Sequence, residues 1–164
     1  MAAHVVSEVD TWRQSGRLFF WRFTENVRNY PGWHFMLDSA GSISVSSLVR
    51  AMSRSSTPCI RIVQVSLPTA EVLRVANNRN AGCVAPTRLR IEFDIADSHT
   101  WSLNDDGVAV HWRLGSRTAT AVADAFADPA KFFDSAIGTE PVLWSWGLLQ
   151  VSPPDKSQER TRGR

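Results

Sequence analysis

The chain has 164 residues, of which 43% are hydrophobic and 21% are charged. These proportions are typical of a folded globular protein and exclude an intrinsically disordered one. The formal net charge of +2 lies in residues 152–164, where four basic residues stand against two acidic ones, so the rest of the chain is formally neutral. We therefore predict a single domain over residues 1–151, followed by a disordered basic tail over residues 152–164.

The charge distribution also bears on partners. Nucleic-acid binding requires a clustered basic face, which a neutral body lacks, so nucleic acid enters only as a second alternative, bound through the tail. No apolar run is long enough to span a bilayer and no signal peptide is recognisable. We expect a cytoplasmic protein with no membrane partner, in which Cys59 and Cys83 are free thiols.

The first predicted element is a helix over residues 9–27. Apolar and small residues recur there at spacings of three and four, which places them along one helical face. The run LFFWRF at residues 18–23 is a strand in the alternative interpretation, because a short apolar run does not by its period separate a strand from a helix.

A strand and a second helix are predicted next. Residues 33–37 alternate, with Trp33, Phe35 and Leu37 on one face, and are typical of a strand. Ser42 is the expected cap of the helix that follows. Its apolar stripe has helical spacing and consists of Val45, Leu48, Val49 and Met52.

The middle of the chain combines a strand with a polar loop. Residues 59–67 are rich in β-branched side chains and predict a strand, and residues 69–74 predict a short helical turn. Residues 77–86 have the composition of a loop. Three of its residues have many hydrogen-bonding groups and little apolar surface, so we expect them to face solvent or a partner: Asn77, Asn78 and Arg79.

A hairpin follows the clearest strand of the sequence. In residues 88–95 apolar and charged side chains alternate, which indicates one buried and one solvated face. Residues 101–103 and 108–114 flank Asn104-Asp105-Asp106-Gly107, a turn that favours a hairpin because Asp-Gly accepts positive φ. Three consecutive strands without helices between them predict an antiparallel meander.

The last elements are a helix over residues 118–127 and a strand over residues 142–148, in which Trp144 and Trp146 share a face. We expect these two indoles to form an aromatic cluster with Trp101 and Trp112. The order of elements predicts the α+β class: a mainly antiparallel sheet of about five to six strands, with three helices packed mostly on one face.

Common catalytic signatures do not occur. The chain has no phosphate-binding loop, no dinucleotide fingerprint and no Gly-x-Ser-x-Gly elbow. We expect no cofactor, and no metal because no pair of histidines has the spacing of ligands on a helix. The alternative to a binding protein is a small enzyme or ligand-binding domain with a cleft formed by His34, Asp97, His99 and His111.

A non-enzymatic protein-binding module is the favoured hypothesis. Tryptophan and arginine dominate the energetics of protein interfaces, and the loop and the last strand present both. No catalytic residue is assigned. The expected binding residues are Asn77, Asn78, Arg79, Trp144 and Trp146.

Four stretches together resemble a group of small bacterial proteins of unknown function: Phe20-Trp21-Arg22, Pro31-Gly32-Trp33, Asn77-Asn78 and the DSAIG sequence of residues 134–138. The resemblance covers most of residues 18–147 and implies no catalytic residue. In size and style the chain is also similar to toxin-immunity proteins, which implies a protein partner. It departs from them in lacking a strongly acidic or basic face on its body.

Overall fold

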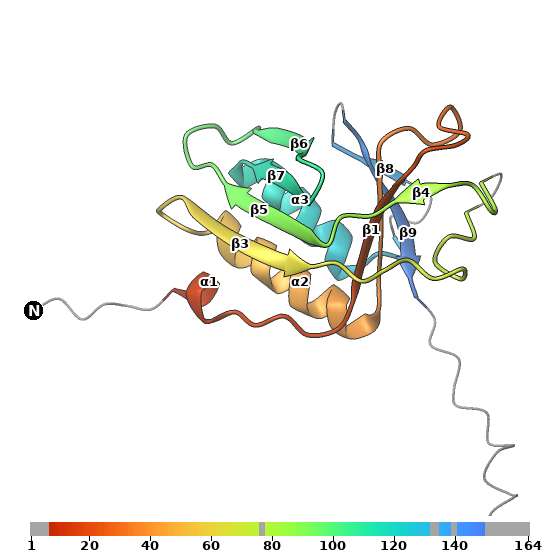
Figure 1. Ribbon diagram of the computed structural model, residues 1–164. Coiled ribbons are helices and arrows are strands. Elements are labelled where there is room, and N and C mark those ends of the chain that lie inside the picture. The colour runs from red at the N-terminus through yellow and green to blue at the C-terminus, as the bar shows by residue number, and fades with distance from the viewer. Residues whose placement is uncertain (1–6, 76–77, 132–134, 139–140, 150–164) are drawn as a thin grey trace, which may run out of the picture.

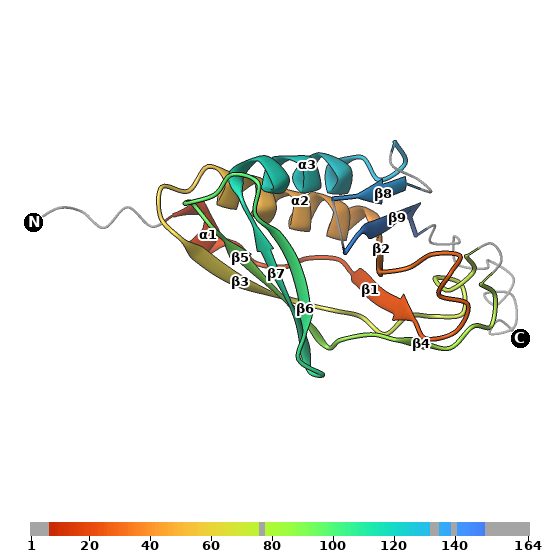
Figure 2. The ribbon, with the colours of Figure 1, turned by 90° about the horizontal axis from the view of Figure 1, so that it is seen from above.

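The computed structural model describes residues 7–75, 78–131, 135–138 and 141–149. These residues form two β-sheets and three helices. The two longer helices lie side by side behind the four-stranded sheet, and the five-stranded sheet lies at the other end of the molecule (Figure 1). Figure 2 shows the same helix pair from above, along one side of the four-stranded sheet and next to β8 and β9.

The four-stranded sheet has the order β3 (Cys59–Gln64), β5 (Arg88–Phe93), β7 (Ala109–Leu114) and β6 (Trp101–Asp105). The predicted hairpin is confirmed, since β6 and β7 pair antiparallel. The predicted meander is wrong, because β5 pairs with β7 in parallel and β6 lies at the edge. Burial explains this order: β7 contributes Val110, Trp112 and Leu114 to the core, as a central strand does, whereas only Leu103 of β6 is buried.

The five-stranded sheet has the order β4 (Cys83–Val84), β1 (Leu18–Phe23), β2 (Trp33–Leu37), β9 (Leu143–Leu148) and β8 (Ser135–Ile137). Strands β2 and β9 pair in parallel, and the other pairs are antiparallel. The strands predicted over residues 33–37 and 142–148 are therefore confirmed, while β4 lies inside the stretch that the sequence predicts to be a loop.

The helix predicted over residues 9–27 is wrong. Only α1 (Glu8–Thr11) is helical there, and the alternative strand over residues 18–23 is observed as β1. Gly16 separates the two with a φ of +69°, and a Cβ at this position would lie 2.0 Å from the backbone nitrogen of Gly41. Five of the six residues of β1 are buried, so both faces of the strand are apolar and the alternation expected of a half-exposed strand is missing.

The two long helices are α2 (Ser39–Ser53) and α3 (Ser116–Ala127), and their positions agree with the predicted helices. The predicted cap of α2 is wrong: Asp38 precedes the helix and accepts a hydrogen bond from the backbone N–H of Gly41 over 2.7 Å. Ser42 lies inside the helix, where its hydroxyl donates to the carbonyl oxygen of Phe126 in α3. The predicted apolar stripe of α2 is buried throughout.

One large core joins both sheets to the helices. Trp112 of β7 lies 6.4 Å from Phe20 of β1 and 6.0 Å from Phe126 of α3, measured between ring centroids. A second, smaller hydrophobic cluster covers the opposite face of the five-stranded sheet. The α+β class is confirmed, with mostly antiparallel strands and three helices, although the strands are divided between two sheets.

Both cysteines are free, as predicted. Among the described residues, no helix combines the length and the apolarity that crossing a membrane requires.

Candidate functional site

Aromatic side chains gather on the face of the five-stranded sheet that points away from the helices. Alternation along β1, β2 and β9 places residues of all three strands on this face, and the turn before β2 adds Tyr30. Their rings form what we call the aromatic cluster: Trp21, Phe23, Tyr30, His34, Trp144 and Trp146.

His34 lies at the centre of the aromatic cluster. Its ring stacks on Trp21 and on Trp146, with centroid distances of 5.4 Å and 5.9 Å. The indole N–H of Trp146 donates to Nδ1 of His34 over 2.8 Å. Because an indole nitrogen only donates, the proton of the neutral imidazole is on Nε2, which lies 3.2 Å from the carbonyl oxygen of Tyr30 and donates to it.

The environment of His34 keeps its ring neutral. Burial lowers the pKa of His34 from 6.5 to about 4, against a smaller raising effect of the hydrogen bond to Tyr30. Both ring nitrogens have partners and the side chain is fully buried. We infer a packing role for His34, because a proton-transfer role would need a nitrogen open to a substrate.

Residues 65–75 and 78–82, which we call the covering segment, close the aromatic cluster from outside. Val72 and Val75 are buried in the same hydrophobic cluster as Trp21 and Trp146. A hydrogen bond from the N–H of Leu73 to the carbonyl oxygen of Thr69 closes one turn, in agreement with the predicted helical turn. The segment is thereby anchored to the sheet by its apolar side chains.

The end of the covering segment differs from the exposed loop that the sequence predicts. Asn78 is only 1% exposed. Its Oδ1 accepts a hydrogen bond from Asn29 over 3.1 Å, its N–H donates to Val75, and its carbonyl oxygen accepts from Ala81. Asn78 therefore holds the loop in place, because it offers three hydrogen bonds to neighbouring backbone and side chains. Asn77 lies outside the described residues.

A hollow opens on the outer side of the covering segment, and we call it the arginine pocket. Its volume is about 530 Å³, within the usual range of ligand-binding cavities. Leu73 and Ala81 are half-buried in it, and Asn80 stands at its rim in a left-handed conformation with φ of 62°. The lining residues are Ala70, Leu73, Arg74, Arg79, Asn80 and Ala81.

Two arginines, Arg74 and Arg79, line this hollow. Arg74 and Arg79 are both exposed, and within the described part of the chain neither forms an ion pair with a carboxylate. Three of the five arginines in the strands differ, since Arg22, Arg90 and Arg113 each have an acidic partner. The arrangement offers two guanidinium groups over a partly apolar floor, which suits a carboxylate on an aliphatic stem.

The structure places most of the expected binding residues in this one region. Arg79 lines the arginine pocket, and Asn78 lies under the loop that carries it. Trp144 and Trp146 are in the aromatic cluster, where their indole N–H groups donate to Pro31 and His34. Trp146 is 7% exposed, so it supports the covering segment from below and does not form an exposed patch.

The aromatic cluster that the sequence predicts has a different membership. Trp101 and Trp112 pack against each other at 5.5 Å in the large core, on the other side of the five-stranded sheet from Trp144 and Trp146. The expectation fails because β6 and β7 belong to the other sheet, which adjacency in sequence does not reveal.

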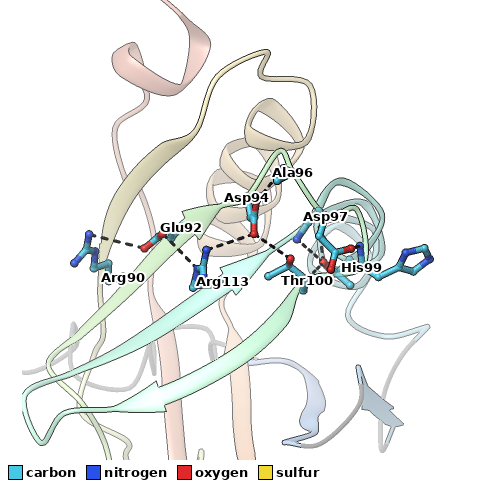
Figure 3. A network of polar contacts seen from close by, with 10 residues as sticks. Arg90, Glu92, Asp94, Ala96, Asp97, His99, Thr100 and Arg113 are labelled. Carbon is cyan, nitrogen blue, oxygen red and sulfur yellow. Dashed lines mark hydrogen bonds and ion pairs between the residues drawn. The ribbon is translucent and has the colours of Figure 1, made fainter.

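The residues of the alternative cleft are dispersed. His34 belongs to the five-stranded sheet, whereas Asp97 and His99 lie in the loop between β5 and β6. Figure 3 shows Asp97 and His99 at the end of a ladder of charged groups, where Oδ1 of Asp97 accepts from the backbone N–H of His99. His111 is on β7, with Nε2 2.7 Å from Oδ2 of Asp106. No hydrogen bond joins the four side chains to one another among the described residues.

The charged ladder itself is internally compensated. Arg113 lies 3.4 Å from both Glu92 and Asp94, and Arg90 lies 3.9 Å from Glu92 (Figure 3). Such pairs on an open sheet face contribute little to stability, but they leave few unpaired charges on this face. In the described part of the chain, no group of three or more histidine, cysteine or acidic side chains is placed to hold a metal ion.

Sequence reasoning missed Arg74, Leu73 and Ala81 as site residues. Arg74 ends the predicted helical turn, and Arg79 follows five residues later in the predicted loop. This short separation was the available sign that the two arginines lie close together. Neither the family models nor the curated proteins and solved structures include a match to this chain.

Proposed function

We propose that this chain is a non-enzymatic protein-binding module, and that its arginine pocket receives an acidic segment of the partner. The observation that carries the proposal is the pair of guanidinium groups of Arg74 and Arg79 at one hollow, neither of which has an acidic partner among the described residues. Arginine binds carboxylates through two parallel hydrogen bonds, which gives both affinity and orientation.

The base of the pocket supports this role. Val72 and Val75 are buried in the aromatic cluster below, and Asn78 is held by three hydrogen bonds. Residues that are already held in place in the free chain lose less conformational entropy when a partner binds, so more of the contact energy appears as affinity. Leu73 and Ala81 between the arginines offer an apolar surface to the stem of a glutamate or to a neighbouring aliphatic residue.

The test uses the full chain and two peptides of equal length, one with adjacent glutamates beside leucine and one with glutamine in their place. We expect the acidic peptide to shift the Nε–H resonances of Arg74 and Arg79 in NMR spectra, and the glutamine peptide to leave them unchanged. Binding should weaken as salt is raised, because exposed charges are screened. Free glutarate distinguishes a small carboxylic acid from a peptide as the ligand: it should bind at least about ten-fold more weakly than the acidic peptide, since it lacks the neighbouring apolar contacts.

A matched variant controls for charge alone. The double variant Arg74→Gln, Arg79→Gln should weaken binding of the acidic peptide by about ten-fold, since it removes two exposed arginine–carboxylate pairs of up to about 1 kcal/mol each. Arg88→Gln removes an exposed arginine of β5 and should change the affinity less than two-fold. Equal binding to the double variant and to the unaltered chain, or tighter binding of glutarate than of the peptide, would overturn the proposal.

A further inference from the structure

Strand β3 leaves part of its outer edge without hydrogen bonds. It is the first strand of the four-stranded sheet, and β5 is its only neighbour there. At Gln64 both backbone groups point outward, since its N–H donates to the side-chain amide of Gln14 and its carbonyl oxygen accepts from that amide. Backbone direction alternates along a strand, so the N–H and carbonyl groups of Ile60 and Ile62 point outward as well.

These outward groups have no partner within the described part of the chain. No hydrogen bond from another element reaches the backbone of Ile60 or Ile62, whereas Val65, two residues beyond Val63, donates inward to Thr87. Unpaired edge groups next to apolar side chains are a template for a further strand, and proteins usually protect them with lysine, proline or a bulge. Between Cys59 and Val63 the edge has no lysine, proline or bulge, and its one charged side chain is Arg61.

The side chains beside this edge are apolar and exposed. Ile60 and Ile62 are 46% and 48% exposed, on the face of the sheet that is not covered by helices. Arg61 points to the other face, where its guanidinium group lies over the ring of Trp12 at 5.8 Å and donates to the Trp12 carbonyl oxygen. The charge of Arg61 is therefore engaged within its own chain.

We propose that β3 pairs antiparallel with β3 of a second copy of this chain, about a two-fold axis at Arg61. In that register Ile60 of one copy lies opposite Ile62 of the other, and the outward backbone groups of both residues find partners. The open stretch fits this symmetry, because Gln14 occupies the edge at Gln64 and Pro58 lacks an N–H at the other end. The open stretch of the β3 edge is thereby limited to residues 59–63, and Arg61 is at its centre.

The neighbouring strand is compatible with this arrangement. On β5, Glu92 stands opposite Ile60 and Arg90 stands opposite Ile62. Across the two-fold axis, each row on the outer face then has Glu92 of one copy at one end and Arg90 of the other copy at its far end. On the opposite face the two Arg61 side chains meet at the axis, each held over the ring of its own Trp12, and this like-charge pair lowers the affinity. The two β3 edges contribute five residues each, which is a small contact, so we expect a weak dimer that forms with increasing concentration.

The proposed pairing is separate from the arginine pocket. In Figure 1, β3 and α1 lie at one end of the molecule, and the chain after β3 leads to the region of β4 at the other end. None of Ile60, Arg61 or Ile62 lines the arginine pocket. A dimer formed through β3 therefore presents two arginine pockets, and failure of either proposal leaves the other standing.

Sedimentation of the full chain over a wide concentration range tests the pairing. We expect a reversible monomer–dimer equilibrium, and Ile62→Lys should raise its dissociation constant by about ten-fold, because it places a charge at both apolar contacts of the edge. Ile43→Lys is the matched control, since Ile43 is a 72% exposed isoleucine on α2, and it should leave the equilibrium unchanged. Ile60→Lys provides a second edge variant if Ile62→Lys fails to fold.

Amide hydrogen exchange gives an independent measurement. The N–H groups of Arg61 and Val63, which bond to β5, should be protected at every concentration. Those of Ile60 and Ile62 should exchange fast in the monomer and become protected as the dimer forms. A chain that stays monomeric at the highest concentration, a dimer that Ile62→Lys leaves intact, or protection of Ile60 and Ile62 in the monomer would each overturn the proposal.

Discussion

His34 is a buried base whose two ring nitrogens are both occupied, one by the indole of Trp146 and one by the carbonyl oxygen of Tyr30. Protonation would convert Nδ1 from an acceptor into a donor facing the donor of Trp146. It would also place a charge where the side chain is fully buried. Both effects disfavour the imidazolium, so the hydrogen bond and the burial act in the same direction.

This neutral histidine predicts a specific pH dependence of stability. The pKa of His34 is about 4 in the folded chain and 6.5 in the unfolded chain, so the unfolded state takes up the proton first as the pH falls. The free energy of unfolding should therefore decrease between pH 6.5 and 4, by about 3 kcal/mol in total, because one pKa unit corresponds to about 1.4 kcal/mol. Urea unfolding across this range measures the slope.

A comparison variant isolates the contribution of His34 from those of other groups. His34→Gln has no titrating ring, so its free energy of unfolding should fall less steeply over the same pH range. NMR of the ring protons of His34 provides a direct check, since they should remain those of a neutral imidazole at pH 5. A His34 ring that titrates near pH 6.5 in the folded chain would refute the assignment.

At the scale of elements, the covering segment depends on a few apolar anchors. Val72 is 1% exposed and packs into the cluster that contains Trp21 and Trp146. The residues on the other side of the segment, Arg74 and Arg79, are exposed. The anchors and the charged groups lie on opposite sides of one short stretch, so its apolar packing decides where the guanidinium groups stand.

Val72→Ala should loosen this segment without unfolding the chain. Removal of two buried methyl groups costs about 2 kcal/mol, and we expect faster amide exchange at Leu73 and Ala81 together with weaker binding of the acidic peptide. Val108→Ala is the control, because Val108 is 62% exposed and lies in the β6–β7 turn. Unchanged exchange at Leu73 in Val72→Ala would show that the segment is held by other contacts.

The elements also show which features of this fold are readable from sequence. Amphipathic segments were predicted correctly: β5, the β6–β7 hairpin and α3 each have one apolar face and one polar face. Strand β1 was not, because both of its faces are buried and its apolar residues satisfy a helical spacing equally well. Strand pairing was not readable either, since the hairpin turn at Gly107 does not determine whether β6 or β7 lies next to β5.

The candidate site was partly readable for a related reason. Arg79, Trp144 and Trp146 are of the residue types that interfaces use, and composition alone identifies them. Arg79 lies at the exposed pocket, whereas Trp144 and Trp146 lie in the aromatic cluster beneath it. This difference depends on the contact of the covering segment with the sheet, which is a long-range contact. Asn78 illustrates the limit: a polar loop residue is expected in solvent, but here it is buried and makes hydrogen bonds with Asn29, Val75 and Ala81.

At the scale of the molecule, the two sheets share one core. Trp112 of the four-stranded sheet lies within 6.4 Å of Phe20 in the five-stranded sheet, between ring centroids, and α3 contributes Phe126 to the same contact. The five-stranded sheet also carries the aromatic cluster on its other face. Neither sheet therefore has a complete hydrophobic core of its own, and the domain predicted over residues 1–151 should unfold as one cooperative unit.

Fluorine NMR of the chain labelled with fluorotryptophan tests this cooperativity, because the seven tryptophans report on different places. Trp33 and Trp112 report on the large core, and Trp21 and Trp146 on the aromatic cluster. In a urea titration all of their folded-state resonances should disappear with one midpoint.

Trp112→Ala should lower the free energy of unfolding by about 3–5 kcal/mol and shift the midpoints in the aromatic cluster by the same amount as those in the large core. The exposed substitution Ile43→Ala should shift none of them. Two separate midpoints would mean that the five-stranded sheet and its aromatic cluster hold together without the rest of the molecule, and the shared core would then be a contact between two independently stable parts.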